Sequence, residues 1–293
     1  MMIDRLAVIG VGLIGGSLAM SLRRAGVVGE IVGCGRQREN LELAKARGII
    51  DCYEHDAACA VAGADMVVVS VSLAATGAVL SAINPSLGAD TVVTDVGSVK
   101  GAVIDQARTA LDGNFGNFVP GHPIAGTEQS GASAAFSTLY KGHKVILTPT
   151  AVGRPVAVGR VREMWESAGA TVIEMDAERH DAVLAATSHL PHVLAYALVD
   201  ALGSRDDADS IFEFAAGGFR DFTRIASSNG AMWTEICMEN RQALIDVCGG
   251  FAQHFEQLTR ALEAGDEQAL VAVFSRAREI REKCIIPEAN DRD

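Results

Sequence analysis

Positive charge is scarce in this chain of 293 residues, which carries 25 lysines and arginines against 37 aspartates and glutamates and so has a formal net charge of −12. An acidic chain repels nucleic acid and anionic lipid, and we expect neither as a partner. A negatively charged substrate would therefore require a local basic pocket.

Metal-site spacing and long apolar runs are also missing. The six cysteines include no CxxC pair. We expect no bound metal, and reduced thiols as in a cytoplasmic protein. Residues 6–20 mimic a signal peptide, but glycines interrupt the run and it is too short to span a bilayer. A strand, a tight turn and the start of a helix explain it better, and no other run suggests a membrane segment.

The first part of the chain alternates short apolar runs with helical periodicity, which indicates a doubly wound, mostly parallel sheet. Beyond about residue 176 the strand signal stops and helical patterns take over. We therefore predict an α/β Rossmann domain over residues 1–176, followed by an all-α domain over residues 177–293. Strands are expected at 5–9, 30–34, 64–70, 91–95, 144–148 and 171–175, and the later helices at 177–202, 206–215, 231–264 and 266–284.

A glycine-rich segment follows the first predicted strand and opens a helix. Its pattern, GxGxxG over residues 10–15, is typical of dinucleotide binding: the first glycine allows the tight turn, the second lets the backbone approach the pyrophosphate, and the third lets helix and strand pack closely. We assign Ser70, at the end of the third predicted strand, to the same site. The predicted cofactor-binding residues here are Gly10, Gly12, Leu13, Ile14, Gly15 and Ser70.

The residue after the second strand sorts NAD from NADP, because an acid there binds the ribose 2′-hydroxyl and an arginine accommodates a 2′-phosphate. The chain has Gly35 and Arg36 at this point, then Arg38, with no acid before Glu39. We expect NAD or NADP as cofactor, and the two arginines favour NADP. Solvated arginines with NAD held by backbone contacts remain the alternative.

Four further segments carry candidate site residues. Ser98 follows the fourth strand, at the edge where ligands bind in such sheets. His122 lies between Gly121 and Pro123 in an expected rigid loop, which suits a positioned acid-base group. In the helical part, Ser188-His189-Leu190-Pro191-His192 places two imidazoles on one helix face at a kink. The segment 217–224, GGFRDFTR, leaves the helical pattern and offers guanidiniums that suit a carboxylate.

Taken in order, these motifs resemble the prephenate dehydrogenase family, which includes arogenate and cyclohexadienyl dehydrogenases. The resemblance covers residues 3–284 and is carried by GVGLIGGS at 10–17, DVGSVK at 95–100, GHPIAGTE at 121–128, SHLPH at 188–192 and GGFRDFTR at 217–224. It implies oxidative decarboxylation of prephenate to 4-hydroxyphenylpyruvate, in tyrosine biosynthesis.

The resemblance also implies residue roles. His122 would accept the proton of the substrate hydroxyl, and Ser98 would orient His122 and touch the nicotinamide or the hydroxyl. Arg224 would bind a substrate carboxylate and pair with Glu128 or Asp221 in the empty site. The substrate-binding residues implied are His192, Ser188, Arg224, Thr127 and Glu128, and Trp233 would lie near the site or in the core.

Several alternatives stay open. Arogenate differs from prephenate only in an amino group, and the sequence does not distinguish the two substrates. A β-hydroxyacid dehydrogenase would need a lysine early in the helical part, yet no lysine occurs between Lys144 and Lys283. A non-catalytic dinucleotide-binding sensor would not need His122, Ser98 and Arg224 together. The long apolar helices after residue 231 predict a homodimer formed through the helical domain.

Overall fold

The computed structural model describes residues 2–284 and divides into two compact units, one ending at Leu244 and one beginning at Ile245. Leu244 and Ile245 both lie within residues 177–293, which were expected to form a single helical domain. The predicted domain boundary near residue 176 separates sheet from helix and stays a prediction, since the compact units divide elsewhere.

A six-stranded parallel sheet with the order β3-β2-β1-β4-β5-β6 forms the centre of the first unit. The strand order reverses between β1 and β4, as in a doubly wound fold, and this confirms the predicted Rossmann architecture. All four residues of β4 are buried, as their apolar, β-branched sequence indicates. The strands are β1 (Ile3–Ile9), β2 (Val28–Cys34), β3 (Cys52–Glu54), β4 (Met66–Val69), β5 (Val92–Asp95) and β6 (Phe118–Val119).

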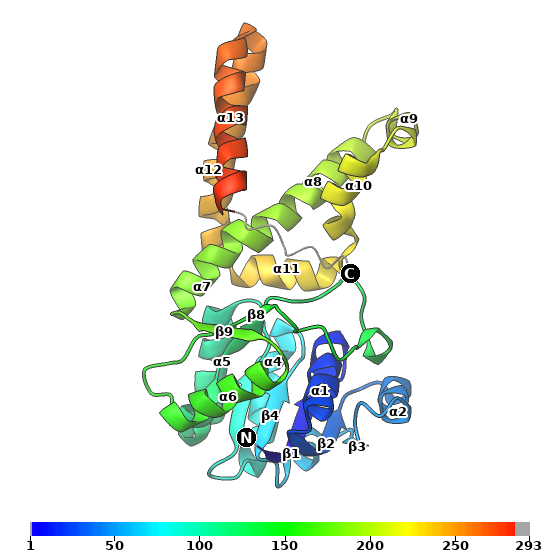
Figure 1. Cartoon of the computed structure of the whole chain (residues 1–293), viewed down its shortest axis with the longest axis vertical. Coiled ribbons are helices and arrows are strands. Elements are labelled where there is room, and N and C mark those ends of the chain that lie inside the picture. Colours follow the sequence, from blue (N-terminus) through cyan, green and yellow to red (C-terminus); the bar gives the residue numbers. More distant parts are fainter. Residues whose placement is uncertain (1, 285–293) are drawn as a thin grey trace. The chain divides into compact units, whose positions relative to one another are not determined.

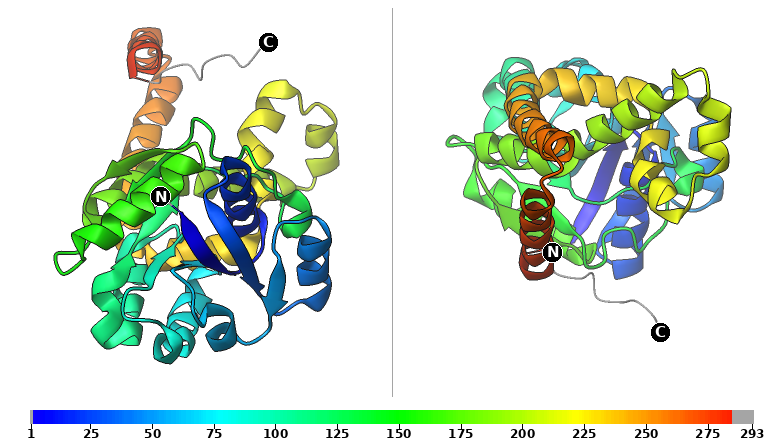
Figure 2. Two further views of the ribbon diagram at one scale, coloured as in Figure 1. Left: turned by 60° about the horizontal axis from the view of Figure 1, so that its bottom comes forward. Right: turned by 90° about the horizontal axis from the view of Figure 1, so that it is seen from above.

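Helices cover both faces of this sheet (Figures 1 and 2). Alternate residues of β1 point to opposite faces: Leu6 and Val8 join the core beneath α1, α2 and α6, whereas Ala7 and Ile9 join the core beneath α3, α4 and α5. The helices are α1 (Leu13–Ala25), α2 (Arg38–Ala46), α3 (Ala57–Val61), α4 (Leu73–Ile83), α5 (Lys100–Leu111) and α6 (Pro155–Ser167), with short 3₁₀ turns η1 (Asn84–Ser86), η2 (Asp112–Asn117) and η3 (Ala132–Ala134).

A second, three-stranded sheet carries His122. It has the order β7-β8-β9, in which β7 runs antiparallel to β8 and β9 runs parallel to it. The expected rigid loop at His122 is therefore wrong: His122 is the middle residue of β7, paired with Ile146. Three residues are too few to show a strand pattern in sequence. The strands are β7 (Gly121–Pro123), β8 (Lys144–Leu147) and β9 (Thr171–Glu174).

The rest of the first unit is helical. α7, a π-helical turn η4 and α8 form one helix from Ala177 to Gly203, which is long and apolar enough to cross a membrane by length and composition alone. This run does not stand out in the sequence, because the helix also contains histidine, serine and proline. Its bounds and those of its neighbours are α7 (Ala177–Leu184), η4 (Ala185–His189), α8 (Leu190–Gly203), α9 (Ala208–Glu213), α10 (Gly217–Thr223), η5 (Arg224–Ser227) and α11 (Gly230–Glu239).

The segment 217–223 is the helix α10, so its predicted departure from helical structure is wrong. Both glycines stand in the first turn, where their cost to helix stability is smaller than in the interior. The helix α12 (Arg241–Ala264) continues from the first unit into the second, which also holds α13 (Glu267–Cys284). A positive φ of 63° at Gly265 ends α12, and Asp266 accepts a hydrogen bond from the backbone N–H of Ala269.

Candidate active site

The candidate site lies at the carboxyl edge of the six-stranded sheet. The glycine-rich loop follows β1 there, Gly35 follows β2, Ser70 follows β4, and the segment with Ser98 follows β5. Ligands of doubly wound sheets bind at this edge, beside the point where the strand order reverses. The fold therefore brings the predicted cofactor residues of three separate segments to one place.

Two glycines of the loop have no room for a side chain. Gly10 has a φ of +100°, and a Cβ there would lie 2.0 Å from the backbone oxygen of Ser70. A Cβ on Gly15 would lie 2.4 Å from the carbonyl oxygen of Gly10 and 3.1 Å from the Ser70 Cβ. Ser70 therefore packs directly against the tight turn, and this close packing places the start of α1 beside the end of β4.

Gly12 is different, because an added Cβ there would meet no protein atom within 4 Å. It is the N-cap of α1, and the first turn of that helix holds no acidic side chain. The backbone N–H groups of this turn, together with the helix dipole, suit an anion. The open space over Gly12 and the chemistry of these donors fit the pyrophosphate of a dinucleotide.

The segment after β2 is exposed at Arg36 and Arg38. Arg38 forms an ion pair with Glu42 at 2.8 Å, and His55 Nδ1 lies 3.0 Å from the carbonyl oxygen of Gly35. Arg36 forms no ion pair with another residue of the described chain. This end of the site therefore offers a cationic side chain and a neighbouring imidazole, and no carboxylate directly after β2.

His122 is partly buried, and its ring Nδ1 lies 2.9 Å from Nε2 of His180. Burial lowers the pKa of His122 well below its usual value, and the neighbouring charges of His180, Lys100 and His189 lower it further. The imidazole is therefore neutral at neutral pH. A neutral imidazole with one ring nitrogen bound to the protein can accept a proton at the other.

His180 and Asp181 stand behind His122 on α7. The His180 side chain is fully buried, and its Nδ1 lies 2.7 Å from Oδ1 of Asp181. The Asp181 carboxylate also accepts the backbone N–H groups of Lys100 and Gly101, both at 2.8 Å, from the start of α5. Burial acts to raise the pKa of Asp181, but the hydrogen bonds from His180, Gly101 and Lys100 outweigh it and lower the pKa.

Lys100 is fully buried beneath the site. Its Nζ donates to Asp95 Oδ2 at 2.5 Å and to the carbonyl oxygen of Gly121 at 2.7 Å. The lysine thus ties the end of β5 to the strand that carries His122. Removing one partner of such a buried pair leaves the other charge uncompensated, which is why these pairs fix local geometry.

The helical residues connect to the same cluster through Asn240. Its Nδ2 donates to the backbone oxygen of Asp181 at 2.8 Å and to His189 Nδ1 at 3.1 Å. His189 is buried, and burial lowers its pKa to about 4. The ring of Trp233 lies edge-on to His189, with ring centroids 6.0 Å apart. Trp233 is 9% exposed and belongs to the core, and its buried Nε1 has no hydrogen-bond partner within the described residues.

His192 stacks on Trp233, with ring centroids 3.5 Å apart and an angle of 20° between the planes. Its Nδ1 donates to the backbone oxygen of Ser188, 2.9 Å away, in the region where Pro191 interrupts normal helical bonding. Burial lowers the pKa of His192, and the charge of Arg224 acts in the same direction. The neutral ring therefore has its Nε2 available to a ligand.

Arg224 begins η5, and its guanidinium lies 3.3 Å from Glu128 Oε2. Both side chains are largely exposed, as is Thr127, whose hydroxyl accepts the backbone N–H of Gln129. Ser98 is partly buried before α5. The His122 ring is bonded to His180 and not to Ser98 in the described chain, so orientation of His122 by Ser98 stays a prediction. The Arg224–Glu128 pair was expected, and it joins the helical part to the loop after β7.

Four residues of this cluster were not predicted as site residues: Lys100, His180, Asp181 and Asn240. Lys100 stood in the DVGSVK motif without a role. The adjacent His180 and Asp181, just after the last strand, were the only local signal of the pair behind His122. Asn240 offers no signal in sequence, because its contacts depend on how α11 ends against α7.

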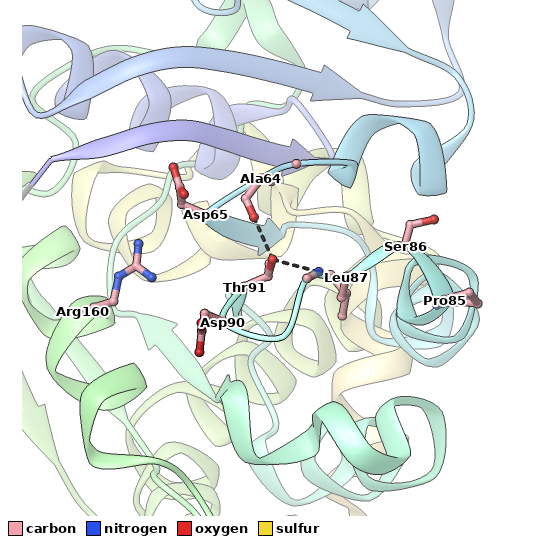
Figure 3. Close-up of a pocket in the computed structure, with 10 residues that line it drawn as sticks. Ala64, Asp65, Pro85, Ser86, Leu87, Asp90, Thr91 and Arg160 are labelled. Carbon is pink, nitrogen blue, oxygen red and sulfur yellow. Dashed lines mark hydrogen bonds between the residues drawn. The ribbon is translucent and has the colours of Figure 1, made fainter.

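A hollow away from this edge lies at the opposite, amino edge of the sheet. It has a volume of about 380 Å³ and lies between the segments that lead into β4 and β5, with Arg160 of α6 at its side (Figure 3). Thr91 closes it by donating to the Ala64 carbonyl oxygen and accepting from the Gly88 N–H. Since dinucleotides bind at the carboxyl edge, we do not assign this hollow to catalysis.

Comparison with known proteins identifies the family. Residues 18–174 match the family described as prephenate dehydrogenase, nucleotide-binding domain, and residues 176–276 match prephenate dehydrogenase, dimerization domain. The chain is 36% identical to a cyclohexadienyl dehydrogenase of Zymomonas mobilis over 94% of both proteins. It is 32% identical to a prephenate dehydrogenase of Bacillus subtilis, over 95% of this chain and 76% of the relative.

Solved structures agree. The structure of prephenate dehydrogenase from A. aeolicus in complex with hydroxyphenyl propionate and NAD+ superposes with a TM-score of 0.90, at 36% identity over 96% of this chain and 98% of that one. Synechocystis arogenate dehydrogenase superposes with a TM-score of 0.80, at 29% identity over 95% and 99% of the two chains. The chain is an oxidoreductase that uses NAD or NADP, and it belongs to the prephenate dehydrogenase family.

Proposed function

We propose that the chain oxidises prephenate with NAD(P)+ and releases CO₂, giving 4-hydroxyphenylpyruvate for tyrosine biosynthesis. The observation that carries this proposal is the geometry of His122, which lies on β7 with its Nδ1 2.9 Å from His180, ahead of the loop whose Glu128 pairs with Arg224. The reaction needs a proton acceptor and a cation for a dianionic substrate, in a protein whose net charge is −12. Relatives named prephenate dehydrogenase support the choice of substrate.

The reaction requires one residue of the protein to accept the proton of the substrate hydroxyl and to hold it temporarily. NAD(P)+, held by the glycine-rich loop, would supply the acceptor for the hydride that leaves the ring carbon bearing the hydroxyl. As the hydroxyl becomes a carbonyl, its proton passes to His122 Nε2. The bond to the ring carboxylate then breaks, and its electron pair enters the ring, which becomes aromatic. The oxygen recovers a proton from His122, so the reaction consumes no base.

The remaining site residues bind and orient the substrate. Arg224 exchanges Glu128 for a substrate carboxylate, a charge-assisted and bidentate contact that an arginine makes well. Thr127 and Glu128 border this contact, while Ser188 and His192 line the side-chain end of the substrate. Ser98 lies between the hydroxyl and the nicotinamide.

We propose that Gly10, Gly12, Leu13, Ile14, Gly15 and Ser70 hold the dinucleotide. Arg36 and Arg38 extend this site toward the ribose, and NADP+ is the preferred cofactor. An exposed arginine and the absence of a carboxylate after β2 support that preference, whereas the ion pair of Arg38 with Glu42 reduces the charge available to a 2′-phosphate.

Arogenate is a second candidate substrate. Its support is the Zymomonas mobilis relative, named cyclohexadienyl dehydrogenase, and the Synechocystis arogenate dehydrogenase structure. A two-by-two assay of prephenate and arogenate, each with NAD+ and NADP+, tests both choices. Prephenate with NADP+ should give the highest kcat/KM, and a higher value with arogenate would reverse the assignment of substrate.

The protein acts as a cytoplasmic homodimer in this proposal. Large apolar side chains are exposed along α12 and α13, and only 22% of the most apolar part of the helix Ala177–Gly203 is buried. Such surfaces are typical of a subunit interface. The matching family domain is described as a dimerization domain. Sedimentation equilibrium should give twice the chain mass of 30.7 kDa.

A further inference from the structure

We infer that Asp181 and His180 are positioning residues that fix the tautomer of His122, so that its Nδ1 carries the hydrogen and its Nε2 is free to accept a proton. The catalytic use of this acceptor rests on the proposed function. The tautomer itself does not, because it follows from hydrogen bonds within the protein.

The chain of hydrogen bonds begins at Asp181, whose carboxylate is held in place by the start of α5. The backbone N–H groups of Lys100 and Gly101 point at its two oxygens from the first turn of α5, where the helix dipole favours a negative charge. Its backbone oxygen accepts from Asn240. An ionised carboxylate only accepts hydrogen bonds. The contact of 2.7 Å with His180 therefore requires a hydrogen on His180 Nδ1.

The next step follows from the chemistry of a neutral imidazole, which has one N–H and one lone pair. With its hydrogen on Nδ1, His180 has a lone pair on Nε2. The contact of 2.9 Å between this atom and His122 Nδ1 is then donated by His122. His122 in turn keeps its lone pair on Nε2. The carboxylate thus sets the state of His122 through one intervening ring, as an aspartate sets a histidine tautomer in hydrolase triads.

The surrounding charges support this arrangement. Lys100 of α5 lies beneath the site, paired with Asp95 of β5, and its positive charge disfavours a second proton on His122. His189 on η4 acts in the same direction. Among the two imidazole rings, His180 is the one that contacts the negatively charged Asp181 carboxylate. A positive charge on His180 would therefore lie directly beside a carboxylate, whereas one on His122 would not.

This difference gives the chain a second use during turnover. When His122 Nε2 receives the hydroxyl proton, the hydrogen on His122 Nδ1 can cross to His180 Nε2. One N–H bond forms on each ring, and the N–H bond on His122 Nδ1 breaks. The positive charge then lies beside the Asp181 carboxylate. The reverse transfer restores the proton when the product oxygen needs it.

The test reads the tautomer directly, by ¹⁵N NMR of the histidine rings in the substrate-free protein. The chain has seven histidines, and loss of signals in His122→Asn and His180→Asn variants assigns the two rings. We expect a protonated Nδ1 and an unprotonated Nε2 on both rings. A protonated Nε2 on His122 in the unmodified protein would overturn the inference.

Asp181→Asn then tests the cause. With the asparagine oxygen in the place of Oδ2, it still accepts from the Gly101 N–H, while the amide group takes the place of Oδ1 and donates to His180 Nδ1. The Lys100 N–H loses its acceptor in this arrangement, the hydrogens along the chain reverse, and one is placed on His122 Nε2. We expect the ¹⁵N pattern of both rings to reverse and kcat to fall by about 10²- to 10⁴-fold, the cost of a lost or wrongly protonated base. The KM for the cofactor should not change.

Asp176→Asn is the matched control. The Asp176 carboxylate also accepts a backbone N–H, that of Arg179, at the start of α7, but the described residues give it no hydrogen bond with the His180 ring. Because asparagine caps a helix about as well as aspartate, this variant should keep its stability, its kcat and the ¹⁵N pattern. Unchanged tautomers in Asp181→Asn would refute the positioning role. Reversed tautomers in an enzyme that was inactive toward both prephenate and arogenate before substitution would refute the proposed function and leave the inference intact.

Discussion

Replacing Arg224 with alanine separates substrate binding from structural stability. The guanidinium lies 3.3 Å from Glu128, but the two side chains are 62% and 42% exposed. An ion pair this exposed contributes about 0–1 kcal/mol to folding. A charge-assisted hydrogen bond to a substrate carboxylate is worth about 1.5–3 kcal/mol. We therefore expect Arg224→Ala to raise the KM for prephenate about 10- to 150-fold, at about 1.4 kcal/mol per factor of ten, with little change in melting temperature.

The effect on kcat should be smaller, because the carboxylate is bound in both the ground state and the transition state. Arg224→Lys should recover part of the KM, since an ammonium cannot form the bidentate pair. Arg205→Ala is the matched control, because the ion pair of Arg205 with Asp207 has a similar exposure and lies outside the cluster around His122. Steady-state kinetics and thermal unfolding of the three variants decide the matter. A lower melting temperature with an unchanged KM for Arg224→Ala would show that the residue only supports the fold.

Two further predictions concern the cofactor and acid stability. Replacing Arg36 and Arg38 together with alanine should raise the KM for NADP+ much more than that for NAD+, and an unmodified enzyme that already prefers NAD+ would contradict the premise. Burial lowers the pKa of His189 from 6.5 to about 4, so protonation favours the unfolded chain as the pH falls through this range. Urea unfolding measures the free energy of unfolding at pH 6.5 and at pH 4, and the decrease between them should be about 3 kcal/mol smaller in His189→Gln than in the unmodified protein. An equal decrease in the two proteins would show that His189 is not buried as a neutral ring.

The sequence was sufficient for the central sheet and the cofactor loop because both are local patterns. Each strand from β1 to β5 except the three-residue β3 is an apolar run that a pattern can identify. The spacing of Gly10, Gly12 and Gly15 indicates a tight turn with close backbone contacts, and this can be predicted without the rest of the fold. The second sheet was less accessible, because β7 has only three residues and its pairing with β8 is a long-range contact.

The arrangement behind His122 could not be predicted for the same reason. His180 and Asp181 acquire their roles only when α7 packs against the start of α5, which brings Asp181 to residues some 80 positions away in sequence. Arg224 shows a different failure. Gly217 and Gly218 suggested a break, but a glycine in the first turn of a helix does not prevent the turns that follow. The resemblance still placed Arg224 beside Glu128, because it depended on the order of motifs and not on local structure.

The measurement that tests the central claim most directly is the turnover of prephenate by His122→Asn beside the unmodified enzyme, followed by the absorbance of reduced nicotinamide. The unmodified enzyme should produce reduced cofactor and CO₂ in equal amounts. The variant should lose about 10²- to 10⁴-fold in kcat while binding the dinucleotide with unchanged affinity, because a positioned base contributes this much and the glycine-rich loop is untouched. A variant with near-normal kcat, or an unmodified enzyme that forms no reduced cofactor from prephenate, would contradict the account.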